Sequence, residues 1–269
     1  MRNMVRDENW DVKKQLVSDE TGRNPLVEAQ NDLVRWFDES RIDQSQLLMR
    51  SSHKLLSSLA TIITYGEIMS DPSFNTNPEI AKKSLETIVS QGKYASVFVE
   101  NLMTVAMLQI GWAKTSIVPV PIVKLVNEAR LEAAGKHHRE VTMENRADSV
   151  LVPGEPFFLS EAFKQVLDNA LKYSPPDAPV HIFIKRREKM GSWVEINVVD
   201  HGVGMSAEEV DRIFEPLYRA NNETNQRIPG SGLGLYLVKG ILQLHKGSAE
   251  VKSRLGNGSV VTLILPVQT

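Results

Sequence analysis

The sequence predicts an α+β protein, in which an N-terminal helical hairpin is followed by a domain of mixed helices and strands. Three observations lead to this prediction. Small and apolar side chains recur at alternating steps of four and three residues between positions 48 and 69, which is the spacing of packed helices. Turn-forming residues interrupt this pattern at 71–78, and beyond Gly111 strand-like and helical segments alternate as far as Pro266.

The helical pattern covers residues 26–109 and contains two stripes of small and apolar residues. The first stripe consists of Leu48, Ser52, Leu55, Leu59, Ile62, Gly66 and Met69, and the second of Leu85, Ile88, Val89, Phe98, Val99, Leu102 and Ala106. Two helices alone bury too little surface to close a core, so we expect two hairpins from two chains to form a four-helix bundle. The sequence therefore predicts a homodimer.

Pro119 and Pro121 indicate a linker between the hairpin and the mixed domain. We therefore expect a hairpin domain at residues 26–112 and a mixed domain at residues 113–269. Residues 1–25 are polar and charged without sustained periodicity, which is typical of a linker or of the remnant of an upstream sensor domain.

The composition excludes several classes of function. The net charge of −2 and the pI near 6.3 provide no basic field for nucleic acid or for an anionic membrane. The absence of cysteine rules out disulfides and thiolate zinc sites, and it fits a reducing compartment. No apolar run approaches the roughly 20 residues that span a bilayer, and the charged N-terminus lacks a signal-peptide core. We therefore expect a cytoplasmic protein without a membrane span.

Polar residues gather on one face of a helix predicted at 161–173. That face consists of Glu161, Gln165, Asn169 and Lys172, which follow one another at steps of four, four and three residues. The opposite face is apolar. Taken alone, this pattern is more typical of a solvated helix face than of a binding site.

Two glycine-containing segments follow this helix. A strand-like run ends in Asp200-x-Gly202-x-Gly204, where the carboxylate can accept hydrogen bonds from a planar amine and the glycines let the main chain approach a ligand. Residues 230–235 read Gly-Ser-Gly-Leu-Gly-Leu and precede an apolar helix, so their N–H groups are suited to holding phosphate. Each segment alone is weak evidence, and the second is equally compatible with a flexible loop before a capped helix.

Together, the order and spacing of these segments resemble the ATPase domain of the sensor histidine kinases of two-component systems. Asn169 corresponds to the family's N-box motif, and the Asp200 segment corresponds to its G1 box. Residues 213–219 correspond to the F box and residues 230–235 to the G2 box. The resemblance implies an α/β sandwich of the gyrase/histidine-kinase type, which binds ATP together with Mg²⁺.

The resemblance also implies roles for individual residues. Asn169 would ligate Mg²⁺, with Gln165 standing where the family often has a second asparagine. Lys172 would neutralise phosphate charge, and Asp200 would accept a hydrogen bond from the adenine amine. The nucleotide site would further include Tyr173, Gly202, Gly204, Tyr218, Arg219, Gly230, Gly232, Leu233, Gly234 and Leu235.

Residues 219–229 are rich in polar side chains, so we expect them to form a mobile lid over the nucleotide. Tyr218, Arg219 and Arg227 are candidates for nucleotide contact. A packed tyrosine and a solvated arginine are equally compatible with the sequence.

The predicted hairpin supplies a phosphate acceptor. The segment around His53 resembles the family's H box, in which a serine precedes the histidine as Ser52 does here. A neutral imidazole can attack a γ-phosphoryl group, so the resemblance implies that His53 is the catalytic nucleophile. Lys54 departs from the pattern, because the family usually has an acidic residue there that takes up a proton. Ser57 stands where the phosphatase reaction of the family uses Thr or Asn.

Three functions remain open. The leading hypothesis is an autokinase that phosphorylates His53 and passes the phosphoryl group to an aspartate of a response-regulator receiver domain. The second is a nucleotide-binding pseudokinase, a dimeric scaffold with weak or no autokinase activity, which Lys54 favours. The third is a gyrase-like ATPase clamp, which the position of His53 in the hairpin disfavours.

Overall fold

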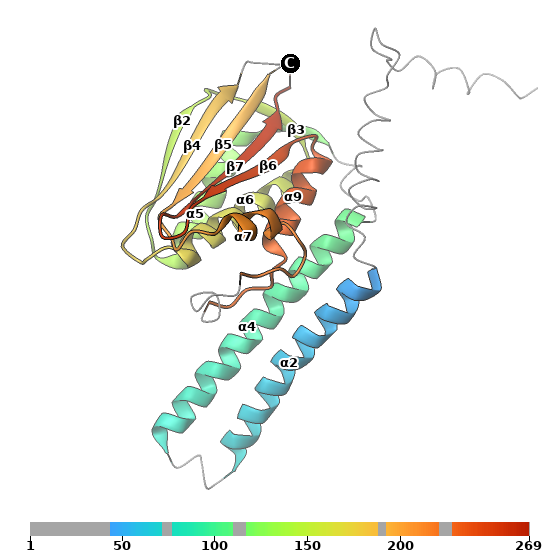
Figure 1. The fold of residues 1–269 in the computed structure, drawn as a ribbon, viewed down its shortest axis with the longest axis vertical. Coiled ribbons are helices and arrows are strands. Elements are labelled where there is room, and N and C mark those ends of the chain that lie inside the picture. Colours follow the sequence, from blue (N-terminus) through green and yellow to red (C-terminus); the bar gives the residue numbers. More distant parts are fainter. Residues whose placement is uncertain (1–43, 72–76, 110–116, 188–191, 221–227, 269) are drawn as a thin grey trace, which may run out of the picture. The chain divides into compact units, whose positions relative to one another are not determined.

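The structure, a computed structural model, describes residues 44–71, 77–109, 117–187, 192–220 and 228–268. The predicted linker at 1–25, the beginning of the predicted helical region at 26–43 and most of the predicted lid, 221–227, lie outside these residues. Within the described part, a helical hairpin comes first and a mixed α/β domain follows, as the sequence predicts (Figure 1).

The hairpin consists of helix α2, Gln44–Ser70, and helix α4, Pro78–Gln109 (Figure 1). Pro78 is the first residue of α4, where its missing N–H needs no helical partner. Asn77 precedes it, and its Oδ1 accepts a hydrogen bond from the N–H of Glu79 at 3.0 Å. The predicted break between the two helices is therefore confirmed, and this local capping chemistry explains where α4 begins.

The mixed domain is built on a five-stranded sheet with the strand order β2-β4-β5-β7-β6. The strands β2 and β4 are parallel, and the other neighbouring pairs are antiparallel. The strands are β2 Val141–Arg146, β4 Val180–Arg187, β5 Trp193–Asp200, β6 Ser248–Ser253 and β7 Ser259–Pro266. Helices pack against one face of this sheet (Figure 1). They are α5 Ile122–His137, α6 Pro156–Tyr173 and α9 Gly234–Leu244, and a short helix α7, Ala207–Arg212, follows β5.

The core of this domain lies between the sheet and its helices. Along β5, the buried residues Val194, Ile196 and Val198 alternate with partly exposed ones, so one face of the strand is buried. Helix α6 buries Phe163 and Leu167 on the side opposite its polar residues. The predicted amphipathic helix is therefore confirmed, and its polar face is left available for a site.

Pro119 and Pro121, which predicted a linker, lie instead in strand β1, Val118–Pro121. This strand pairs antiparallel with β3, Leu151–Gly154, in a separate two-stranded sheet. Pro119 lies opposite Pro153, so neither member of that pair has an N–H, and the ladder bonds must fall on the neighbouring pairs. The linker prediction was wrong because prolines at alternate positions of a short edge strand are compatible with pairing.

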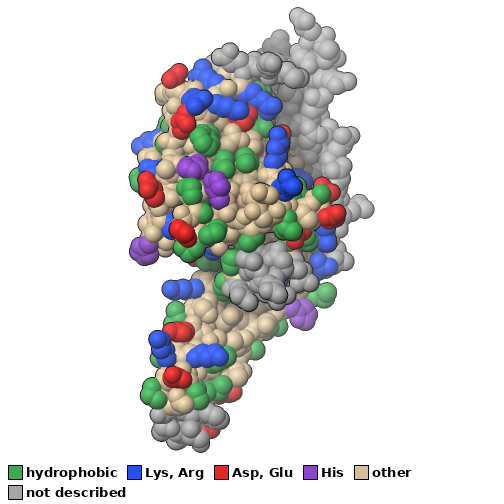
Figure 2. Space-filling view, turned by 60° about the vertical axis from the view of Figure 1, so that its left-hand side comes forward, with side chains coloured by type: hydrophobic (Ala, Val, Ile, Leu, Met, Phe, Trp, Pro, Cys, Tyr) green, Lys and Arg blue, Asp and Glu red, His purple; other side chains and the backbone are tan. Residues whose placement is uncertain are grey.

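The surface in view in Figure 2 intersperses basic and acidic side chains, in keeping with the net charge of −2. In the part of the chain that the structure describes, no helix is both long and apolar enough to cross a bilayer.

Candidate nucleotide-binding site

A cavity of about 620 Å³ opens between helix α6, the loop after β5, residues 218–220 and 229–235, and helix α4. It brings together most of the residues that the sequence analysis assigned to a nucleotide: Gln165, Asn169, Lys172, Tyr173, Asp200, Gly204, Tyr218, Arg219, Gly230, Gly232, Gly234 and Leu235. Gly202 and Leu233 are not among the lining residues. The predicted residues therefore converge in space, although they come from four separate segments of the chain.

Helix α6 supplies the polar wall of this cavity. Glu155 caps the helix by accepting a hydrogen bond from the N–H of Phe158 at 2.8 Å, and Pro156 occupies the first helical position. The cap fixes where the helix begins, and because the opposite, apolar side of α6 is buried, its polar face, including Gln165 and Asn169, points into the cavity.

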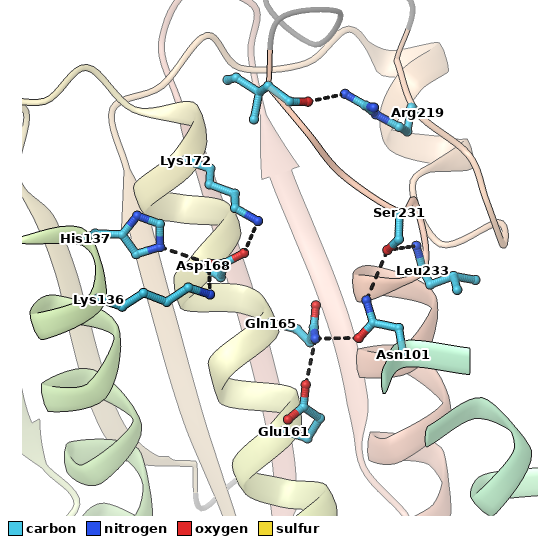
Figure 3. A network of polar contacts seen from close by, with 11 residues as sticks. Asn101, Lys136, His137, Glu161, Gln165, Asp168, Lys172, Arg219, Ser231 and Leu233 are labelled. Atoms are coloured by element: carbon cyan, nitrogen blue, oxygen red, sulfur yellow. Dashed lines mark hydrogen bonds and ion pairs between the residues drawn. The ribbon is translucent and has the colours of Figure 1, made fainter. Parts of the chain in front are cut away.

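Asp168, which the sequence analysis overlooked, organises the basic residues at the cavity rim (Figure 3). Its carboxylate forms an ion pair with Lys172 and contacts Lys136 Nζ at 3.0 Å and His137 Nε2 at 2.9 Å. Burial favours the protonated acid, but the charges and hydrogen bonds of these neighbours outweigh it and lower the pKa of Asp168 to about 2. Lys172 is therefore held in place and partly neutralised, and the i,i+4 spacing of the pair was the signal in the sequence.

Asp200 ends strand β5 at the floor of the cavity. Its Oδ1 accepts hydrogen bonds from the N–H groups of Gly202 at 2.8 Å and Ser259 at 3.2 Å. Burial raises the pKa of Asp200, while these two bonds act in the opposite direction. No described residue donates to Oδ2, so this oxygen remains an acceptor for a ligand.

The glycines beside Asp200 make room for the protein's own main chain. A Cβ on Gly202 would lie 2.4 Å from the carbonyl oxygen of Tyr173, and a Cβ on Gly204 would lie 2.0 Å from that of Arg254. Gly204 also has a φ of +64°. These contacts give both glycines a packing role in addition to the ligand clearance that the sequence suggested.

The glycine loop at 230–235 is packed against the segment before the predicted lid. Gly232 has a φ of +75°, and its carbonyl accepts a hydrogen bond from the N–H of Leu217 at 2.8 Å. Leu233 is fully buried, so its side chain belongs to the core, and any contact with a ligand would involve its main chain. Helix α9 begins at Gly234, and Gly234 and Leu235 line the cavity, so the N-terminal end of a helix lies at this site.

Two amide side chains converge on the start of α9. A Cβ on Gly234 would lie 2.6 Å from Gln165 Oε1 and 3.8 Å from Asn169 Nδ2. The Gln165 amide presents its oxygen at this place, whereas the nearest Asn169 atom is its amide nitrogen. An amide oxygen fits a hard cation such as Mg²⁺, which takes oxygen ligands and is usually completed by phosphates and water. Among the described residues, no cluster of three or more His, Cys, Asp or Glu side chains could hold a metal.

Two of the lid candidates lie at the cavity, and the third, Arg227, lies outside the described residues. Arg219 Nη1 donates to the carbonyl of Gly230 at 3.2 Å, which ties the beginning of the predicted lid to its end. The ring of Tyr218 lies 4.5 Å from the guanidinium of Arg212. Tyr218 and Arg219 are thus held by protein contacts and still border the cavity.

The H box lies on α2 and does not line the cavity. His53 and Ser57 are exposed, and the carbonyl of Ser57 accepts a hydrogen bond from Thr61 Oγ1 at 2.9 Å. Lys54 connects the H box with the cavity, because its Nζ donates to the carbonyl of Ser231 in the glycine loop at 3.0 Å. Burial, and then the charge of Arg219, lower the pKa of Lys54.

Helix α4 forms a wall of the cavity that the sequence analysis did not anticipate. Lys93, Tyr94 and Asn101 line it, and Phe98 is fully buried in a stack with the ring of Tyr94 at 5.9 Å between centroids. These residues belong to the predicted hairpin stripe or its flanks, and nothing in their local sequence indicates contact with a domain far along the chain.

Comparison with known proteins places this site in a family. Residues 154–269 match the family described as histidine kinase-, DNA gyrase B- and HSP90-like ATPase. The chain is 26% identical over 87% of its length to the sensor histidine kinase YkoH of Bacillus subtilis, covering 50% of that protein. It is 30% identical over 93% of its length to the signal transduction histidine-protein kinase/phosphatase MprB of Mycobacterium ulcerans, covering 48% of that protein.

The chain thus spans about half the length of these two curated relatives. A solved structure of the Acinetobacter baumannii histidine kinase AdeS superposes with a TM-score of 0.60 at 18% identity, covering 81% of this chain and 98% of that one, and it supports the fold. The chain is therefore similar to sensor histidine kinases over most of its length, and the residues that match the ATPase family follow a helical hairpin here.

Proposed function

We propose that this chain is an ATP-dependent protein-histidine autokinase, which phosphorylates His53 and passes the phosphoryl group to an aspartate of a response-regulator receiver domain. The observation that carries the proposal is the single cavity that unites Asn169, Lys172, Asp200 and the glycine loop, in a chain whose hairpin bears His53. Its relatives are histidine kinases, which supports the same reaction.

In this proposal the cavity residues bind and orient the nucleotide. Asp200 Oδ2 accepts from the adenine amine, and Lys172 and Arg219 lie at the same cavity as counter-charges for phosphate. Asn169 and Gln165 would hold Mg²⁺ through their amide oxygens. When bound, this ion would offset the negative charge that develops on the phosphoryl group.

His53 is the proposed nucleophile. A nitrogen of its neutral ring attacks the γ-phosphorus of ATP, the bond from that phosphorus to the bridging oxygen breaks, and ADP leaves. The proton on the other ring nitrogen passes to solvent or to a base. In the second step the other ring nitrogen takes a proton back, an aspartate oxygen of the receiver domain attacks the phosphorus, the phosphorus–nitrogen bond breaks, and neutral histidine is released. Because His53 does not line the cavity, the nucleotide site and the acceptor must approach each other before transfer.

A homodimer would cover the exposed apolar side chains of the hairpin. On α2, Met49, Leu56 and Ile63 follow one another at steps of seven residues and are 58%, 62% and 60% exposed. On α4, Leu85 and Met103 are 52% and 55% exposed. Monomeric proteins rarely leave such rows in water, so we propose that two hairpins form a four-helix bundle.

We retain residues 26–112 as the proposed dimerisation and acceptor domain and 113–269 as the proposed catalytic domain. Signals would reach residues 1–25 from an upstream sensor domain or protein. Because the proposed reaction consumes ATP and uses a receiver domain, we place it in the cytoplasm.

A second function, a pseudokinase scaffold, is favoured by one observation. Lys54 places a cation beside His53 and is engaged with Ser231, so it supplies no base to the imidazole. Incubation with Mg²⁺ and γ-labelled ATP, followed by acid treatment, separates the candidates. An autokinase gives protein-bound label that acid removes. A scaffold gives neither label nor turnover, and a gyrase-like clamp releases only free phosphate.

A further inference from the structure

A buried amide on the hairpin is built into the proposed nucleotide site (Figure 3). Asn101, on helix α4, is 3% exposed. Its Nδ2 donates to Ser231 Oγ of the glycine loop at 3.1 Å, and its Oδ1 accepts from Gln165 Nε2 of helix α6 at 2.9 Å. One side chain of the hairpin therefore contacts both the N box and the G2 box.

The chemistry at the two ends of this network fixes the direction of every hydrogen bond in it. At one end, the carboxylate of Glu161 accepts from Gln165 Nε2 at 2.7 Å. At the other end, the main-chain N–H of Leu233, which can only donate, donates to Ser231 Oγ at 3.1 Å. Reversing either amide would set donor against donor or acceptor against acceptor. The orientation of Asn101 is therefore determined by its partners.

The orientation of Gln165 follows from the same network. Both N–H bonds of its amide are used, one by Asn101 and one by Glu161. Its Oε1 is consequently turned toward the start of α9, where a Cβ on Gly234 would lie 2.6 Å from it. This is the oxygen that would face Mg²⁺ in the proposed reaction.

We propose that Asn101 is a positioning residue of the nucleotide site, which holds the Gln165 amide oxygen and the glycine loop in the geometry that binds Mg·ATP. Nucleotide binding is then coupled to contact between the catalytic domain and helix α4 of the hairpin. This inference rests on the proposed ATP-dependent function and adds a residue to it from outside the ATPase family match, which covers 154–269.

The coupling has a required consequence. If contact with α4 strengthens nucleotide binding, bound nucleotide must strengthen that contact by the same factor. The hairpin that carries His53 would therefore sense whether the catalytic site is loaded, through a residue that does not touch the reacting atoms.

The test uses the full chain and titration calorimetry with Mg²⁺ and a non-hydrolysable ATP analogue. Asn101→Leu keeps the approximate volume and removes both hydrogen bonds, so we expect the dissociation constant to rise by about three- to tenfold, the range for uncharged hydrogen bonds. Asn101→Asp keeps the acceptor for Gln165 and should lie closer to wild type. Ser96→Ala, at an exposed position of α4, is the matched control and should leave the affinity unchanged.

A double-mutant cycle distinguishes positioning from a general effect on folding. In a Gln165→Leu background, Asn101→Leu should raise the dissociation constant by a smaller factor than in the wild-type background, because one of the two contacts through which Asn101 acts is already absent and only its bond to Ser231 remains. An unchanged or tighter affinity in Asn101→Leu, or an equal loss in both backgrounds, would overturn the inference. Failure of the wild-type chain to bind the analogue would instead overturn the proposed nucleotide function, so the two failures are distinguishable.

Discussion

Replacing Lys54 tests how the H box works in this chain. The structure gives Lys54 a structural partner, because its ammonium donates to the carbonyl of Ser231 at 3.0 Å. In the same position, a carboxylate would face that carbonyl oxygen as a second acceptor and would lie next to His53 in sequence. Lys54→Glu therefore changes two things, the contact with the glycine loop and the proton acceptor beside the imidazole, whereas Lys54→Met changes only the first.

The expected sizes of these two effects differ. A buried hydrogen bond from a charged donor stabilises a contact by about 1.5–3 kcal/mol. Because Lys54 is partly exposed, we reduce this to about 1 kcal/mol, which corresponds to about fivefold in the equilibrium between docked and undocked positions of the glycine loop against α2. A positioned general base contributes about 10²- to 10⁴-fold to a rate. We therefore expect Lys54→Glu to phosphorylate His53 at least about tenfold faster than wild type, and Lys54→Met at most about fivefold faster.

Initial rates of labelling at saturating Mg·ATP measure both effects. Helix propensity barely differs among Lys, Glu and Met, so the helix itself is not a confounder. A slower Lys54→Glu variant would contradict the reasoning and show that the cation draws the γ-phosphate toward His53. Equal rates in all three proteins would show that position 54 takes no part in proton transfer or in docking.

Three further predictions concern the metal ligand, a buried histidine and the dimer. Asn169→Ala should abolish phosphorylation while the melting temperature stays near that of wild type, and full activity in the folded variant would remove Asn169 from the mechanism. Burial lowers the pKa of His245, whose neutral ring accepts from the N–H of Glu155 at 2.9 Å. The unfolded chain then binds more protons, so the free energy of unfolding should fall as the pH drops through the ordinary value of 6.5, and chemical denaturation of His245→Leu between pH 8 and 5 should lack this component. Light scattering should give a dimer at micromolar concentration, with Leu56→Glu shifting it to monomer, and a monomeric wild type would contradict the four-helix bundle.

Local chemistry explains why much of the fold could be predicted from the sequence. The break before Pro78, the amphipathic helix that carries Asn169 and the strand that ends at Asp200 each follow from a few neighbouring residues. The predicted nucleotide residues then converge because the topology places the end of β5 and the start of α9 beside α6.

Contacts between distant segments could not be predicted in the same way. In the sequence, Asn101 is a single polar residue beside an apolar stripe, and only the structure pairs it with Ser231, 130 residues later. For Lys54, the sequence shows only that its positive charge departs from the family pattern. It does not show that the partner of Lys54 is Ser231, 177 residues away. Considered with its sequence neighbours alone, Pro119 predicts a break in secondary structure. Its place in a strand depends on pairing with β3, about thirty residues further along the chain.

The position of the phosphate on the chain tests the central claim most directly. After incubation with Mg·ATP, digestion at neutral pH and mass spectrometry should place a single acid-labile phosphate on the peptide that contains His53. His53→Gln should carry none, in the wild-type and in the Lys54→Glu background alike. An acid-stable phosphate, a phosphate on another residue, or label that persists in His53→Gln would contradict the account.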